Sequence, residues 1–87
     1  MIIKLSTDIA INTDDINYIL AYSSKTSKDI LKTASENNMH LNLTKNKATK
    51  SLVCMNNGKV ISLNSRIDTL IKKINAKDLA IENITEE

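Results

Sequence analysis

With 87 residues, the chain has room for one domain, and a domain of this size buries only a thin core. Two tyrosines are its only aromatic residues, so aliphatic side chains must fill that core, and we expect a second copy of the chain to complete it in a homo-oligomer. A single cysteine excludes a disulfide within the chain. The apolar run at the N-terminus ends at Lys4 and is too short for a signal peptide or a membrane span. We therefore expect a cytoplasmic protein with no membrane partner.

The net charge of +2 is distributed unevenly along the chain. Residues 1–36 carry four lysines and five acidic residues, a balance of −1. Residues 37–75 carry seven Lys or Arg residues against Asp68 alone, a balance of +6. Residues 76–87 carry one lysine against four acidic residues, a balance of −3. The positive charge is therefore concentrated in the middle of the chain.

The N-terminal segment predicts three strands. Short apolar runs at residues 2–5 and 9–11 flank Thr7-Asp8, which is a typical turn pair. After a polar turn, residues 16–22 alternate in the manner of a strand. We expect this strand to have one firmly apolar face, formed by Ile16, Tyr18, Leu20 and Tyr22.

A helix is expected over residues 28–37, after a serine-rich break. Thr26 or Ser27 can cap its N-terminus, and Asn37-Asn38 supplies a residue that tolerates the left-handed conformation at its end. The apolar face of this helix is formed by Ile30, Leu31 and Ala34. The helix should therefore pack against the strands on that face.

A short strand at residues 41–43, a lysine-rich loop at residues 44–50 and a β-hairpin follow. Asn57-Gly58 lies between two apolar runs and predicts a two-residue type I′ turn, in which both central residues have positive φ. The resulting register pairs Asn56 with Lys59, Met55 with Val60, Cys54 with Ile61, Val53 with Ser62, and Leu52 with Leu63. One face of the hairpin is expected to be fully buried and the other half-buried, the first formed by Leu52, Cys54, Ile61 and Leu63.

Ser65 is a typical N-cap for a second helix, with Asp68 in its first turn. The apolar stripe of that helix is formed by Ile67, Leu70, Ile71 and Ile74. The sequence thus predicts an α+β fold: a small antiparallel β-sheet with a central hairpin, one crossing helix and one C-terminal helix. Residues 1–75 should form the domain, and residues 76–87 an acidic C-terminal extension that is partly helical or frayed.

Residue sets that support catalysis are nearly absent from the chain. His40 is the only histidine, and a lone histidine on a short strand is typical of a structural or surface residue. Cys54 lies in the middle of an apolar strand and is typical of a small buried hydrophobe. The single glycine is used by the hairpin, so no glycine-rich loop can hold a phosphate. We therefore expect neither an enzyme nor a cofactor or metal site.

The basic residues of the middle segment are the remaining functional signal. The loop carries Lys45, Lys47 and Lys50, while Lys59 lies at the hairpin tip and Arg66 just beyond the hairpin. Lysine lacks the bidentate geometry with which arginine reads base edges, so such a set would mainly contact phosphates of nucleic acid. A lysine-rich surface that is only solvated is the equally simple interpretation of the charge.

Four segments of the chain resemble a known family: residues 38–44, 46–51, 52–55 and 60–63. Their sequences and order are similar to those of bacterial extracellular-matrix (biofilm) regulators of the RemA and RemB type, over residues 2–74. The loop that reads Gly-Arg-Arg-Thr-Arg in RemA-like members reads Asn-Lys-Ala-Thr-Lys here, from Asn46 to Lys50. Lys50-Ser51 matches the Lys-Ser of RemB-like members.

The resemblance implies a DNA-binding transcriptional regulator that assembles into a closed ring and contacts double-stranded DNA on its basic outer surface. By position it implies DNA contacts from Lys47, Thr49 and Lys50. Ala48 departs from the family's arginine, and Asp15 falls where the family has a further arginine. The alternative is a ring-forming scaffold or protein-interaction module of the same fold without DNA binding. The full set of expected DNA-binding residues is Lys45, Lys47, Thr49, Lys50, Lys59 and Arg66.

Overall fold

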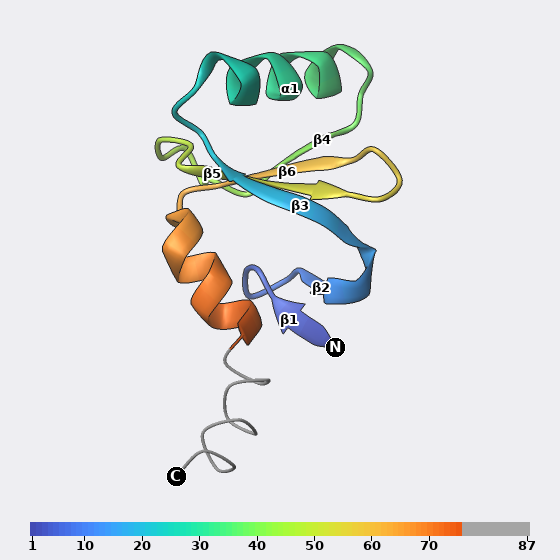
Figure 1. The fold of residues 1–87 in the computed structure, drawn as a ribbon, viewed down its shortest axis with the longest axis vertical. Coiled ribbons are helices and arrows are strands. Elements are labelled where there is room, and N and C mark those ends of the chain that lie inside the picture. Colours follow the sequence, from blue (N-terminus) through green and yellow to red (C-terminus); the bar gives the residue numbers. More distant parts are fainter. Residues whose placement is uncertain (76–87) are drawn as a thin grey trace, which may run out of the picture.

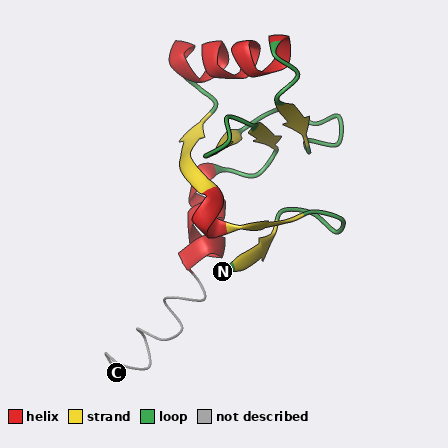
Figure 2. Cartoon of the chain, turned by 90° about the vertical axis from the view of Figure 1, so that its right-hand side faces the viewer, coloured by secondary structure: helices red, strands yellow, loops and turns green. Residues whose placement is uncertain are grey.

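The computed structural model describes residues 1–75, which form three layers around a four-stranded sheet (Figure 1). The elements in chain order are β1 (Ile2–Lys4), β2 (Ala10–Asn12), the 3-10 turn η1 (Thr13–Asp15), β3 (Ile16–Ala21), α1 (Lys25–Glu36), β4 (His40–Asn42), β5 (Ser51–Met55), β6 (Val60–Leu63) and a C-terminal helix described over residues 67–75. Helix α1 covers one face of the sheet, and the β1–β2 hairpin and the C-terminal helix cover the other (Figures 1 and 2). The expected acidic extension, residues 76–87, lies outside the described residues.

The α+β class, the hairpin and both helices confirm the predicted architecture, but the main sheet is mixed rather than antiparallel. Its strand order is β3-β5-β6-β4, and β4 pairs parallel to β6. The reason is the path of the chain: α1 carries it from β3 at one edge of the sheet to β4 at the other edge. The strands β1 and β2 form a separate antiparallel pair, as the apolar runs around Thr7-Asp8 predict.

The hairpin between β5 and β6 has a three-residue loop, so the predicted two-residue turn is wrong. The Met55 amide donates to the Lys59 carbonyl at 2.8 Å, which leaves residues 56–58 as the loop. Within it the Gly58 amide donates to the Met55 carbonyl at 3.0 Å, and Gly58 has a φ of +91°. This is a turn followed by a glycine bulge, the usual solution for three-residue hairpins. Every cross-strand pair is shifted by one residue, to Ser51 with Leu63, Leu52 with Ser62, Val53 with Ile61 and Cys54 with Val60.

The shifted register changes which residues share a face of the hairpin. Leu52, Cys54 and Val60 pack against Ala34 of α1. On the opposite face, the shared core cluster is formed by Val53, Ile61, Leu63 and Leu70. The expected half-buried face is therefore wrong: Leu52 is 0% exposed on one side and Val53 is 1% exposed on the other. Both faces are buried because a layer covers each of them.

Strand β3 does not present the single apolar face that its alternation predicts. A bulge between Ile16 and Tyr18 shifts the register against β5. Ile16 then packs with the cluster on the side of the C-terminal helix, whereas Leu20 packs on the α1 side. Tyr18 is left 46% exposed at the edge of the sheet.

Helix α1 begins three residues earlier than predicted, because Ser24 rather than Thr26 or Ser27 is its N-cap. The Ser24 hydroxyl accepts from the Ser27 amide at 3.2 Å. The Ser27 hydroxyl donates to the Ser24 carbonyl at 2.7 Å, and this lets Ser27 be buried inside the first turns. At the other end, Asn38 has a φ of +58°, which confirms the predicted left-handed stop.

Replacing Gly58 should lower the free energy of unfolding through backbone strain alone. A β-carbon at this position would lie 3.7 Å from the Met39 methyl group, an ordinary contact, so space is not the constraint. We expect Gly58→Ala to cost about 1 to 2 kcal/mol in urea denaturation, because alanine disfavours positive φ. Gly58→Asn is the control: it is larger but tolerates the left-handed region, so it should cost less. An equal or larger loss for asparagine would contradict this explanation.

Candidate functional site

The lysine-rich loop, residues 44–50, is held at both ends by hydrogen bonds to the sheet. At its start, the Asn42 side-chain oxygen accepts from the Thr44 amide at 2.9 Å and from the Thr44 hydroxyl at 2.7 Å. At its end, the Lys50 amide donates to the Leu63 carbonyl at 2.8 Å, and the Lys50 carbonyl accepts from the Tyr22 amide at 3.0 Å. The loop is thus fixed in place before any partner binds.

A tight turn shapes the middle of this loop. The Lys47 amide donates to the Thr44 carbonyl at 3.1 Å, and the two residues between them, Lys45 and Asn46, have φ values of +55° and +67°. Asparagine tolerates this region, whereas for lysine it costs about 1 kcal/mol. The side chain of Asn64 holds the far side of the turn by donating to the Ala48 carbonyl at 2.6 Å. The backbone keeps this strained conformation because the hydrogen bonds on both sides of the turn hold it in place.

The structure brings five of the six predicted contact residues to one end of the sheet, and four of them are exposed. Lys45, Lys47 and Lys50 are exposed on the loop. Arg66 is exposed at the same end, since the Ser51 hydroxyl next to Lys50 donates to the Ser65 carbonyl at 2.7 Å. We call these four residues the basic end. Thr49 belongs to the same loop but is half-buried.

Lys59 lies apart from the basic end. It follows the hairpin loop at the opposite end of β5 and β6 (Figure 1), about 16 Å away for a five-residue strand at 3.3 Å per residue. Asp15 is at this far end too, because the Asn56 amide donates to the Asp15 carbonyl at 2.8 Å. The charge reversal at Asp15 therefore does not offset the lysines of the loop.

The residues that position the loop, Asn42 and Asn64, were missed by sequence reasoning. Asn42 two residues before Thr44 is the spacing of an Asx turn, in which the side chain binds the backbone two positions on. That signal was present in the sequence. The pairing of Asn64 with Ala48 spans 16 residues and had no local signal.

His40 has a structural role beside the loop. Its Nε2 lies 2.7 Å from the Ser62 hydroxyl and its Nδ1 lies 3.2 Å from the Ser35 hydroxyl of α1. The Ser62 hydroxyl also donates to the Asn42 side-chain oxygen at 3.4 Å. The histidine thereby links α1, the buried strand β6 and the residue that anchors the loop.

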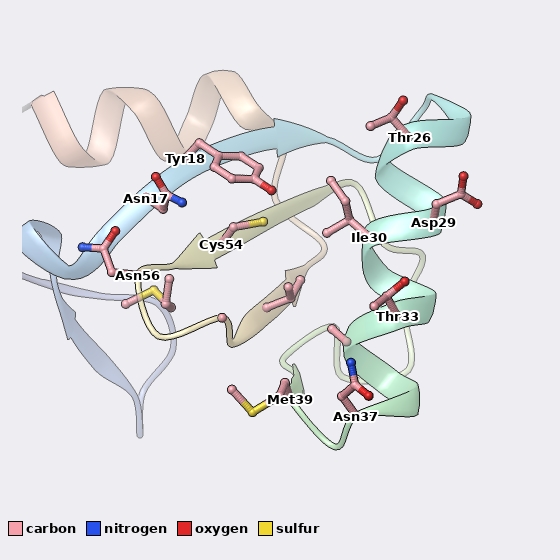
Figure 3. A pocket seen from close by; sticks show the side chains of 14 residues that line it. Asn17, Tyr18, Thr26, Asp29, Ile30, Thr33, Asn37, Met39, Cys54 and Asn56 are labelled. Atoms are coloured by element: carbon pink, nitrogen blue, oxygen red, sulfur yellow. The ribbon is translucent and has the colours of Figure 1, made fainter.

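A groove of about 480 Å³ opens between α1 and the hairpin end of the sheet (Figure 3). We call it the α1 groove; residues that line it include Tyr18, Asp29, Ile30, Thr33, Met39 and Cys54. The Cys54 thiol is hydrogen-bonded with the Tyr18 hydroxyl, which raises the pKa of Tyr18. Burial raises the pKa of Cys54, against the smaller opposing effect of that hydrogen bond. The thiol is thus neutral at physiological pH and is not an activated nucleophile.

Residues 1–75 contain no cluster of three or more His, Cys, Asp or Glu side chains that could hold a metal ion. Over the same residues, no helix has the length and apolar character needed to cross a membrane.

Removing the Asn42 anchor should destabilise the chain and loosen the loop. Thr44 is 4% exposed, so Asn42→Ala leaves its amide and hydroxyl buried without their acceptor. We expect a loss of about 1 to 3 kcal/mol in the free energy of unfolding, together with faster hydrogen exchange at the Thr44 amide. Asn42→Asp keeps the accepting oxygen and should retain the protection of that amide. Unchanged exchange in the alanine variant would contradict the anchoring role.

The buried thiol predicts a loss of stability at alkaline pH. Because the folded chain has the higher pKa for Cys54, the stabilisation from the neutral thiol is complete below its ordinary value of 9.0 and is lost as pH rises above it. Comparing Tyr18→Phe with the double variant Tyr18→Phe/Cys54→Ser removes the titration of Tyr18 from the measurement. The free energy of unfolding of Tyr18→Phe should fall more steeply above pH 9.0 than that of the double variant. Parallel curves would show that the thiol ionises equally well in the folded chain.

The comparison with protein families agrees with the resemblance noted in the sequence. The model of the RemA-like family, described as extracellular matrix regulatory protein A-like, matches residues 2–74. Comparison with curated proteins found no match. The family is named for regulation of the extracellular matrix and not for a catalysed reaction. The chain therefore belongs to the RemA-like family of extracellular matrix regulatory proteins.

Proposed function

We propose that this regulator binds double-stranded DNA as a closed ring of identical copies, with the basic end of each copy on the phosphates. The observation that carries the proposal is the anchored loop, which holds Lys45, Lys47 and Lys50 exposed beside Arg66. Asp68, in the first turn of the C-terminal helix, is the nearest acidic residue along the chain to this set. The surface thus has the positive balance that phosphate binding requires.

One copy would bind DNA weakly. Three or four lysine or arginine contacts to phosphate give an affinity that falls steeply with salt, because each contact releases about one condensed counterion. In a ring the same surface is repeated, and binding of one copy raises the effective concentration of the next at the DNA. Avidity of this kind makes a weak surface useful, and this is why the proposal joins assembly to DNA binding.

Sequence preference would come mainly from the shape and bendability of DNA. Lysine ammonium groups contact phosphates as point charges and do not read base edges in the bidentate way that arginine does. A set of phosphate contacts repeated at fixed spacing favours DNA that bends to follow it. Arg66 is the one residue of the basic end that has the geometry for a bidentate contact.

A ring-forming scaffold without DNA binding is the second candidate, and Ala48 is the observation that favours it. Ala48 is exposed at the middle of the loop, and its backbone carbonyl is used for the anchor from Asn64. The side chain adds no charge where RemA-like members, by resemblance, have an arginine. A scaffold would keep the fold and the ring and would show no affinity for DNA at low salt.

Reversing two charges of the basic end separates these candidates. Lys47→Glu with Lys50→Glu should lower the affinity for an AT-rich duplex by at least about 100-fold in gel-shift titrations and reduce the salt dependence, because two phosphate contacts per copy are lost. The matched control is Lys28→Glu with Lys32→Glu on α1, which makes the same change in net charge at exposed positions outside the predicted DNA-binding set. The control pair should keep most of the affinity.

The outcomes decide between the functions as follows. No binding by the unchanged chain even at low salt would reject DNA binding and leave the scaffold. Equal losses in both charge-reversed pairs would show that the overall charge and not the basic end governs binding. Native mass spectrometry of each variant should give the same assembly as the unchanged chain, because none of the four lysines is in the apolar core.

A further inference from the structure

Two backbone amides of the lysine-rich loop have no acceptor within the described chain. The amides of Lys47 and Lys50 donate to carbonyl groups of the protein. Between these paired donors, the amides of Ala48 and Thr49 donate to no group of the described residues. A backbone N–H is a strong donor that needs a partner, so both are available to water or to a ligand.

The Asn64 side chain fixes the direction of one of these two amides. Its nitrogen donates to the Ala48 carbonyl at 2.6 Å. That carbonyl and the Thr49 N–H belong to the same peptide group, which is planar and trans, so they point to opposite sides of it. The Thr49 N–H is therefore directed away from Asn64. Because turning the peptide would break the bond from Asn64, the donor is held in this direction before a ligand arrives.

Ala48 leaves the approach to this donor open. The residue is exposed, and its side chain is a single methyl group. The β-carbon of a residue flanks the amide that follows it, so a larger side chain at this position would crowd a ligand at the Thr49 amide. The alanine thus removes a charge from the loop and at the same time uncovers a backbone donor.

The groups around the Thr49 amide select an anion. The exposed lysines Lys47 and Lys50 lie on either side of it along the chain. The Thr49 hydroxyl has no partner among the described residues and adds an O–H donor on the same residue. Two donors beside two ammonium groups match a ligand that carries negative charge on several acceptor oxygens, as phosphate does.

We propose that the Thr49 amide donates to a phosphate oxygen of the DNA backbone, that Asn64 is the positioning residue for this donor, and that Ala48 gives the phosphate access to it. The proposal rests on the DNA binding proposed above and adds a neutral contact to the charged ones. A hydrogen bond from an amide to an anion strengthens binding by about 10-fold. Unlike an ammonium group, the amide neutralises no phosphate charge, so it adds affinity without adding salt dependence.

Asn64→Ala tests the positioning role without changing any charge. In gel-shift titrations with an AT-rich duplex, we expect the affinity to fall by about 10-fold, whereas the slope of log affinity against log salt should stay unchanged. Asn17→Ala is the control: it makes the same truncation at an exposed position of β3 and should bind as the unchanged chain does. If Asn64 only held the lysines in place, the slope would fall as well. That result, or an affinity equal to that of the control, would overturn the proposal.

Ala48→Leu tests access to the donor while the bond from Asn64 stays intact. The change adds bulk without charge at an exposed position, where substitutions rarely disturb folding. We expect an affinity about 10-fold lower with an unchanged salt slope, whereas Ala48→Ser should bind as the unchanged chain does. Equal binding by the leucine and serine variants would contradict the contact, even if Asn64→Ala fails to fold.

Hydrogen exchange at the two unpartnered amides reports the contact directly. In the assembly bound to DNA, exchange of the Thr49 amide should slow by at least about 10-fold relative to the free chain. Exchange of the Ala48 amide should change little, because its direction is not fixed by Asn64. Equal slowing of both amides would show that DNA covers the loop without bonding to the Thr49 donor, and the proposal would then be wrong.

The outcomes keep this inference separate from the function proposed above. If the unchanged chain shows no affinity for DNA at low salt, DNA binding fails and this inference fails with it. If the chain binds DNA and the double lysine reversal weakens binding, while Asn64→Ala and Ala48→Leu do not, the proposed function stands and the amide contact is rejected.

Discussion

Burial of the β5–β6 hairpin on both faces is the constraint on which the rest of the structure depends. Leu52 and Ile61 are at most 2% exposed, although they face opposite sides of the sheet. A hairpin with two apolar faces is unstable until a layer covers each. Helix α1 supplies one layer, and the β1–β2 hairpin with the C-terminal helix supplies the other. The chain uses its short N-terminal strands and its last described helix for the same purpose.

The two buried serines of this hairpin connect the core to the loop. Ser51 is 0% exposed and binds the carbonyl of Ser65, which sets the distance between the start of β5 and the segment that carries Arg66. Ser62 is 1% exposed and lies between His40 and Asn42. A polar group buried in an apolar layer must find a partner, and both serines find theirs at the edge where the loop is attached. The geometry of the basic end is thus a consequence of how the core satisfies its polar groups.

The sequence predicts the elements of this fold well and their pairing less well, for reasons that particular residues make clear. Asn57-Gly58 locates the hairpin, but a two-residue turn and a three-residue turn with a glycine bulge both use a glycine at that place. Polarity normally decides the register, because a slip of one residue moves each side chain to the other face. Here both faces are apolar, so the pattern does not distinguish the two registers. The start of α1 was predicted with Thr26 or Ser27 as its cap, whereas Ser24 is the cap in the structure and Ser27 is buried within the first turn.

Prediction of the candidate site follows the same division between local and distant information. The lysines of the loop, residues 44–50, could be identified because charge and sequence are local properties. The grouping of Arg66 with them, and the separation of Lys59 from them, depend on the direction of β5 and β6 and on the bond from Ser51 to Ser65. No periodic pattern in the sequence predicts how far Arg66 and Lys59 lie from the loop. The short strand at residues 41–43 was predicted, but its parallel pairing with β6 was not, because a three-residue strand has too few residues to show its partner or its direction.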